Sequence, residues 1–136
     1  MSKAPDQVAA NGRLAATILL AETPFFNYDP VDCLADPDIS NCDAAKSLAL
    51  DRDYAALESA AADAAGVDLL SINELLCPET SCPVVDDDIV VYRDAHHLTA
   101  TYMDYLATPI SRMLEGKPPY PSPRPSAGPG EIAAAA

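Results

Sequence analysis

A short apolar run that ends in Asp-x-x-His is the feature that most constrains the fold of this chain. Residues 89–92 read as a strand that breaks at Arg93, and an amphipathic segment begins just past Leu98. Asp94 and His97 therefore lie on one turn between a predicted strand and a predicted helix. At this spacing the Asp94 carboxylate can face one ring nitrogen of His97, which leaves the other nitrogen free to act as a general base. The simpler alternative is a surface carboxylate beside a helix-capping histidine.

Two apolar runs with a helical stripe between them occupy the first half of the chain. Residues 15–21 and residues 67–72 have the continuous apolar character of buried parallel strands. Residues 47–65 carry apolar side chains at helical spacing, and Gly66 suits the end of a helix. The stripe consists of Leu50, Tyr54, Leu57, Ala61 and Ala64. This order predicts a βαβ unit, with residues 25–46 as a long polar loop inside it.

A hairpin is predicted next. Residues 84–85 and 89–92 can pair across the acidic run 86–88. No further carboxylates follow at the spacing of a calcium-binding loop, so we interpret the acidic run as a solvated turn rather than a metal site.

The last predicted element is a helix over residues 100–115, because apolar side chains recur there at spacings of three and four. Thr99 suits the N-cap position. Pro109 removes one backbone hydrogen bond, so it should kink the helix or mark a late restart. Tyr102 and Tyr105 are expected to pack in or against the core rather than to stack on sugars.

Composition predicts one globular domain between two unpatterned ends. We expect residues 1–12 to be a flexible lead-in, residues 13–116 to form the domain, and the proline- and alanine-rich residues 117–136 to be a disordered tail. The net charge of −13 excludes nucleic acid as a partner and disfavours an anionic membrane surface. We find no export signal and no apolar run long enough to cross a membrane.

Four cysteines bound two short polar loops. Cys33 and Cys42 enclose one loop, and Cys77 and Cys82 enclose the other. Three pairings are possible, and local pairing is the simplest because each bond then closes a short loop. The alternative is zinc, with His96 or His97 as an added ligand, but C-x8-C and C-x4-C match structural zinc sites poorly. We predict two local disulfides, which indicate an oxidising compartment outside the cytosol; in a reducing cytosol the thiols would stay free.

These motifs resemble the SGNH/GDSL-type hydrolase domain found behind the membrane part of bacterial acyltransferase-3 proteins, which O-acylate cell-surface glycans. The most specific matches are Cys77-Pro78, Cys82-Pro83 and the Tyr-Arg-Asp-x-x-His-Leu-Thr of residues 92–99. Supporting matches are Leu20-Ala21-Glu22-Thr23-Pro24, Asp32-Cys33-Leu34 and Cys42. The resemblance covers about residues 14–114 and only the C-terminal half of such a domain. It implies part of a three-layer, flavodoxin-like α/β fold.

The resemblance also implies a function. Asp94 and His97 would be the acid and base of a Ser-His-Asp triad, and His96 would be a spacer at the rim of the cleft. The implied reaction is acyl transfer to or from a cell-surface glycan through a serine ester, with no metal or organic cofactor. The implied partner is an acyltransferase-3 membrane domain, and the implied location is the periplasm or cell envelope.

The sequence departs from the family at the nucleophile. None of its serines lies in Gly-Asp-Ser or in Gly-x-Ser-x-Gly, and no oxyanion Asn is recognisable. Ser71, after the second predicted strand, is the least unsuitable substitute. We therefore expect the chain by itself to be inactive. Two alternatives stay open: a non-catalytic accessory or glycan-binding module, and a gene fragment without independent activity.

Overall fold

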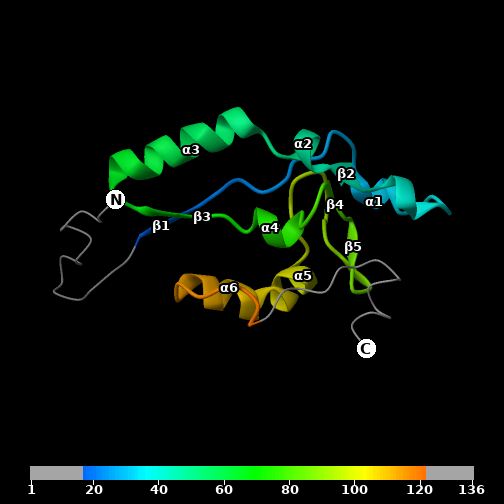
Figure 1. The fold of residues 1–136 in the computed structure, drawn as a ribbon. Coiled ribbons are helices and arrows are strands. Elements are labelled where there is room, and N and C mark those ends of the chain that lie inside the picture. The colour runs from blue at the N-terminus through cyan, green and yellow to red at the C-terminus, as the bar shows by residue number, and fades with distance from the viewer. Residues whose placement is uncertain (1–16, 122–136) are drawn as a thin grey trace.

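A computed structural model describes residues 17–121 of the protein, as short helices and strands (Figure 1). The predicted flexible lead-in, residues 1–12, lies outside the described residues, and so does most of the predicted disordered tail, from residue 122 on. No helix in the described range is both long and apolar enough to span a membrane.

The predicted βαβ unit is confirmed. Strand β1 (Ile18–Leu20) pairs in parallel with β3 (Asp68–Leu70), in a register that places Leu19 opposite Leu69. Helix α3 (Arg52–Ala65) precedes β3 and contacts it. Such a crossover is needed because parallel strands cannot be joined by a tight turn.

The two strands are more exposed than their sequences predict. The continuous apolar runs indicate burial, yet Leu20 is 55% exposed and Ile18 is 39% exposed. In the described part of the chain β1 and β3 pair only with each other, as a two-stranded sheet. Two strands have too few neighbours to cover both of their faces, so the prediction of burial is wrong at these positions.

The predicted helix over residues 47–65 is divided in two. Helix α2 (Lys46–Ala49) ends at Leu50, whose φ of −114° and ψ of 123° are extended. Helix α3 then begins at Arg52, because the Asp51 side chain accepts hydrogen bonds from the N–H groups of Asp53 and Tyr54. An aspartate in this position satisfies amides that have no partner within the helix. The cap fixes the helix start five residues later than the apolar spacing indicates.

The end of α3 is as predicted, but its apolar stripe is not buried. Gly66 adopts a left-handed conformation with φ of 71°, and its N–H donates to the Asp63 carbonyl. Leu57, however, is 67% exposed, while Ala62 on another face is buried. The one buried side chain of α3 is therefore the small Ala62 rather than a member of the predicted stripe.

The predicted loop over residues 25–46 contains short elements. They are helix α1 (Pro30–Cys33), the single 3-10 turn η2 (Ile39–Asn41) and strand β2 (Ala44–Ala45). Strand β2 pairs antiparallel with β4 (Ser81–Cys82), and this pairing joins the two cysteine-bounded loops.

Both predicted disulfides are confirmed. Cys33 bonds to Cys42 with a Cα–Cα distance of 5.7 Å, and Cys77 bonds to Cys82 with a Cα–Cα distance of 4.2 Å. All four cysteines of the chain are thereby paired.

The hydrophobic core lies beside the β1–β3 sheet rather than on one of its faces. Helix α4 (Asn73–Leu76), strand β6 (Ile89–Val90) and helix α5 (Ala100–Tyr105) surround it. Its buried members are Phe26, Cys42, Ala49, Ile72, Leu75, Leu76, Cys77, Cys82, Val84, Val91, Tyr92, Tyr102 and Leu106. The Cys77–Cys82 disulfide is part of this core.

The predicted hairpin is confirmed, but its turn is shorter than the three residues 86–88 that were predicted. Strand β5 (Val85–Asp86) pairs antiparallel with β6, so Asp86 belongs to the strand and only Asp87 and Asp88 form the turn. Both turn residues have positive φ, 51° and 61°. A two-residue turn of this kind matches the twist of the strands. The Asp86 carboxylate accepts a hydrogen bond of 2.7 Å from the Tyr102 hydroxyl.

The final helix is interrupted at Leu106 and restarts at Ala107, so Pro109 lies in the first turn of the second segment, where its missing N–H costs no helical hydrogen bond. Helix α5 ends before Leu106, and α6 (Ala107–Leu114) follows directly. Thr99 caps α5 by accepting from the Tyr102 N–H. Tyr102 is buried, and Tyr105 stacks beside it with 41% of its surface exposed.

Helices lie on both sides of the β1–β3 pair, with α3 on one side and α5 and α6 on the other (Figure 1). Mixed helices and strands with small sheets are the organisation expected for part of a layered α/β domain. The predicted fold class is confirmed.

Candidate functional site

The Asp-x-x-His turn is closed by backbone bonds on both sides. Tyr92 and Leu98 form an isolated antiparallel bridge, and the Arg93 N–H donates to the His97 carbonyl at 2.8 Å. The Thr99 N–H donates to the Val91 carbonyl at 2.9 Å. Residues 93–97 therefore form a short, defined loop between β6 and α5.

Asp94 organises that loop from within. Its Oδ1 atom accepts from the N–H of His96 at 3.0 Å and from the N–H of His97 at 2.8 Å. Aspartate commonly stabilises turns by binding backbone amides that follow it, and here this holds the carboxylate in one orientation.

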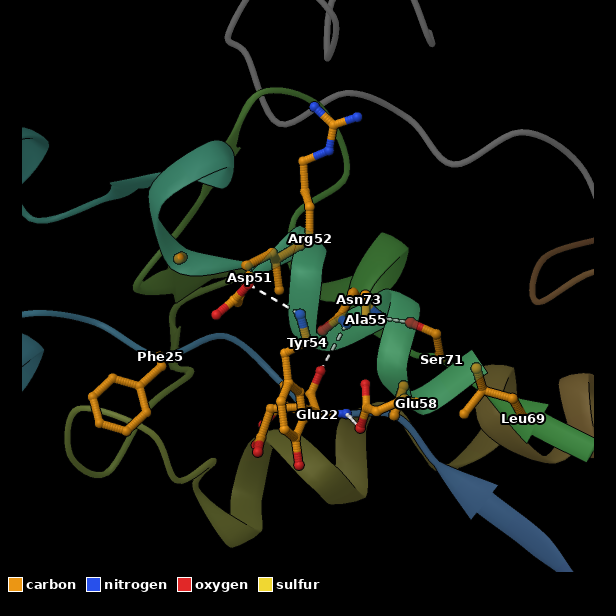
Figure 2. A pocket seen from close by; sticks show the side chains of 14 residues that line it. Glu22, Phe25, Asp51, Arg52, Tyr54, Ala55, Glu58, Leu69, Ser71 and Asn73 are labelled. Carbon is orange, nitrogen blue, oxygen red and sulfur yellow. Dashed lines mark hydrogen bonds between the residues drawn. The ribbon is translucent and has the colours of Figure 1, made fainter. Parts of the chain in front are cut away.

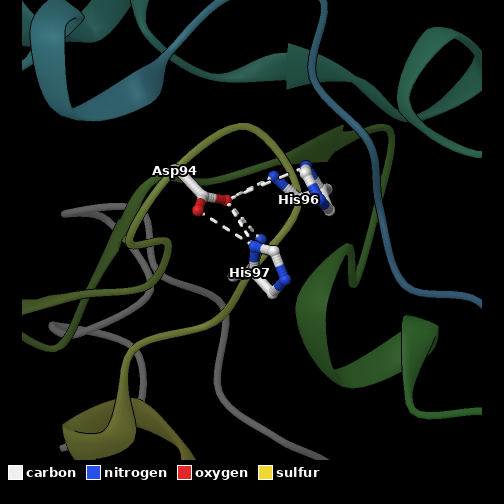
Figure 3. Close-up of side chains that lie close together, drawn as sticks. All are labelled: Asp94, His96 and His97. Carbon is white, nitrogen blue, oxygen red and sulfur yellow. Dashed lines mark hydrogen bonds and ion pairs between the residues drawn. The ribbon is translucent and has the colours of Figure 1, made fainter.

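The same carboxylate faces the ring of His97 (Figure 3). His97 Nδ1 lies 2.9 Å from both Asp94 Oδ1 and Asp94 Oδ2. This confirms the predicted pairing. A proton on Nδ1 is donated to the carboxylate, so Nε2 is the nitrogen left to accept a proton. The His97 side chain is 49% exposed and the Asp94 side chain is 40% exposed, which leaves the pair accessible to a substrate.

The pKa of Asp94 is lowered to about 2 from its ordinary value of 3.8. The largest cause is the hydrogen bond from the His96 N–H; partial desolvation opposes it, and the His97 side chain and N–H add to it. Asp94 is therefore an anion throughout the neutral range. A permanent negative charge therefore lies beside Nδ1 of His97.

A contact that the sequence does not reveal supports the turn from outside. The Phe25 ring stacks on the His96 ring, with centroids 4.8 Å apart and planes 5° from parallel, and the His96 ring lies 4.1 Å from that of His97. The Phe26 N–H also donates to the Ala95 carbonyl at 2.7 Å. Because the segment after β1 and this turn are far apart in sequence, no local motif could predict the stack.

Asp94, His96 and His97 can also be considered as metal ligands. Their ligand atoms lie within 4.8 Å of one another, and imidazole with carboxylate suits several transition ions. The Asp94 carboxylate, however, already accepts two backbone N–H groups and faces His97. The expectation of no metal stays a prediction.

Ser71 has a position that differs from that of a triad nucleophile. Its Oγ atom accepts from the Asn73 N–H at 3.2 Å. Within residues 17–121 no hydrogen bond joins Ser71 to His97.

An α/β arrangement with a histidine–carboxylate pair on a strand-to-helix turn is typical of hydrolases and acyltransferases that use a Ser-His-Asp triad. Residues 6–112 match the family model described as "SGNH domain (fused to AT3 domains)", in which AT3 stands for acyltransferase-3. The match spans well over half of the chain, so this chain belongs to the SGNH domain family that is fused to acyltransferase-3 domains. No curated protein and no solved structure matches it.

Proposed function

We propose that Asp94 and His97 are the acid and the base of an acyl transfer, most simply acetyl transfer, to or from cell-surface glycans. The approach of His97 Nδ1 to both Asp94 oxygens carries the proposal, because it gives the ring the tautomer that a general base needs. The family description supports an acyltransferase-3 membrane domain as the partner.

In this reaction His97 Nε2 removes the proton of a serine hydroxyl while the serine oxygen attacks the acyl carbonyl. The same nitrogen then protonates the leaving alcohol, which leaves an acyl-serine ester. In the second half the acceptor hydroxyl attacks that ester, His97 takes the acceptor proton, and the serine recovers it as the ester bond breaks. Asp94 balances the charge on His97 in both halves.

The serine has to come from another polypeptide segment, because no Gly-Asp-Ser occurs in these 136 residues. Backbone and amide donors for the oxyanion would come with it. This chain then contributes the base, its orienting carboxylate and the rigid turn that carries them.

A location in the periplasm or cell envelope is part of the proposal. Two disulfides support it, because such bonds persist where thiols are not kept reduced. Three of the four half-cystines are fully buried, so the bonds are built into the core.

The test is O-acetyl content of surface glycans in the producing cell, measured as acetate released by mild base. His97→Ala and Asp94→Asn should lower the transfer rate by about a thousandfold or more, because a triad without its base or the correct tautomer retains little activity. Arg93→Ala is the matched control and should keep most of the activity, since the exposed Arg93 closes the same turn through its backbone N–H.

A second candidate is a non-catalytic accessory or glycan-binding module. The observation that favours it is the absence of Gly-Asp-Ser from the sequence. Unchanged O-acetyl content in the His97→Ala strain would refute catalysis and favour this candidate, or a fragment without independent activity.

A further inference from the structure

A cavity of about 500 Å³ lies where β1 and β3 end (Figure 2). Glu22 and Thr23 follow β1, Ser71 and Asn73 follow β3, and the first turns of α3 cover them. The carboxyl ends of parallel strands are where open α/β sheets bind ligands. The volume is within the range of roughly 300–1,000 Å³ that is usual for small-molecule sites.

The polar groups of this cavity are held in place before any ligand arrives. The Asn73 side-chain amide donates to the Glu22 carbonyl at 2.9 Å, and the Glu22 N–H donates to Glu58 Oε2 at 2.8 Å. These bonds connect the ends of both strands to α3. A preformed site loses less conformational entropy on binding.

The lining combines aromatic faces, small apolar groups and carboxylates. Phe25 is 57% exposed and Tyr54 is 46% exposed. The apolar part is lined by Ala21, Ala49, Leu50, Ala55 and Leu69. Glu22 and Glu58 supply hydroxyl acceptors on the wall. A pyranose ring fits this set, because its C–H face packs on aromatic rings while its hydroxyl groups donate to carboxylates.

The carboxylates of the cavity disfavour two other classes of ligand, anions and alkyl chains. Glu22, Asp51 and Glu58 line the cavity, and the one lining cation, Arg52, points away from the two glutamates (Figure 2). An anionic ligand is therefore repelled. An alkyl chain would fill the apolar part but would remove water from carboxylates without giving them hydrogen bonds, which is unfavourable.

We propose that this cavity binds one uncharged sugar ring. Phe25 lines the cavity and also stacks on His96, whose ring lies against that of His97. A sugar bound in the cavity is therefore connected to the proposed base through these packed side chains. The inference that this sugar belongs to the acceptor glycan of the acyl transfer rests on the proposed function. The inference that the cavity binds a sugar does not.

The experiment titrates the ¹⁵N-labelled 136-residue chain with methyl glucoside, methyl galactoside, methyl mannoside and N-acetylglucosamine, followed by NMR. At least one should bind with a dissociation constant of about 1 mM and shift the amides of residues 21–23, Phe25 and residues 71–73. Tyr54→Ala should weaken that binding by about tenfold or more, as expected for loss of a stacking face. Leu57→Ala is the matched control, because it lies on the same helix but does not line the cavity, and its affinity should stay within about twofold.

The uronic acid form of the sugar that binds should bind at least about fivefold more weakly than that sugar, because it adds a negative charge near Glu22, Asp51 and Glu58. Glu58→Gln keeps an oxygen acceptor for the Glu22 N–H and should reduce that difference. This variant tests the cavity even if Tyr54→Ala fails to fold.

His97→Ala separates the two proposals, since it should abolish acyl transfer and leave sugar affinity unchanged. Absence of saturable binding by all four sugars, equal affinity in wild type and Tyr54→Ala, or shifts confined to other surfaces would each overturn the cavity proposal. None of these results would bear on the roles of Asp94 and His97.

Discussion

His97 Nδ1 lies 2.9 Å from both carboxylate oxygens of Asp94, and that carboxylate also accepts the backbone N–H of His97 at 2.8 Å. One aspartate thus orients both the ring and the backbone of the same residue. Because Asp94 and His97 lie three positions apart on one turn, the hydrogen bonds that orient the pair come from the turn itself. This explains why the pair is formed within residues 17–121 although β1 and β3 have only each other as partners.

The titration of Asp94 tests this arrangement. We expect its carboxyl carbon to titrate by NMR with a midpoint near 2, against 3.8 in the urea-unfolded chain. The folded pKa is depressed, so the stabilising effect of ionised Asp94 is fully present above about pH 4 and is lost as pH falls through about 2.

His97→Ala sharpens that measurement. The His96 N–H bond is the first cause of the lowered pKa and persists in the variant, so the midpoint should rise only part of the way toward 3.8. A midpoint near 3.8 in the wild-type chain would show that the carboxylate does not hold the turn in solution.

The disulfides should carry much of the stability of this small domain. Replacing Cys77 and Cys82 together by alanine should lower the free energy of unfolding by about 2 kcal/mol, and replacing Cys33 and Cys42 together by about 3 kcal/mol, because the closed loops differ in length. Urea unfolding of each double variant measures the loss. Peptide mapping of the oxidised protein is the control, and a Cys33–Cys77 link would contradict the local pairing.

The hairpin turn offers a stabilising substitution. Asp88 has a φ of 61°, a conformation that L-residues other than glycine adopt at a cost, and glycine is favoured there in a two-residue turn. Asp88→Gly should raise the free energy of unfolding by about 0.5 kcal/mol after the entropy of glycine in the unfolded chain is subtracted. Ala61→Gly, at an exposed position within α3, is a contrasting control, and glycine should destabilise there by roughly 0.5–1 kcal/mol. Equal effects at both positions would contradict the turn.

The parts of the fold that follow local patterns could be predicted from the sequence. The β1–α3–β3 order, the Gly66 helix end and the hairpin before α5 depend on periodicity and on single residues with special conformations. The start of α3 has a local signal as well, because aspartate is a preferred N-cap residue and Asp51 stands at that position. The apolar spacing that begins at residue 47 predicted a continuous helix instead and missed the break at Leu50.

Burial and long-range contacts could not be predicted in the same way. Leu20 and Leu57 are apolar, yet whether they are covered depends on which elements neighbour them, and the pattern of one segment does not contain that information. The Phe25–His96 stack and the cavity at the strand ends arise where separate segments meet. Of the candidate site, the Asp94–His97 pair was therefore predictable and its surroundings were not.

The isolated chain should lack esterase activity, and the reason is chemical. Hydrolysis by a triad needs an activated nucleophile, and losing the serine costs several orders of magnitude in rate even when the histidine and aspartate remain. Ser71, the least unsuitable hydroxyl, accepts a hydrogen bond from the Asn73 N–H. We expect wild type and His97→Ala to hydrolyse p-nitrophenyl acetate at the same background rate, no faster than free imidazole at equal concentration. The further control is Ser71→Ala, which should change nothing. Turnover well above imidazole that disappears in His97→Ala would show that these 136 residues contain a nucleophile, and loss of that turnover in Ser71→Ala would identify it.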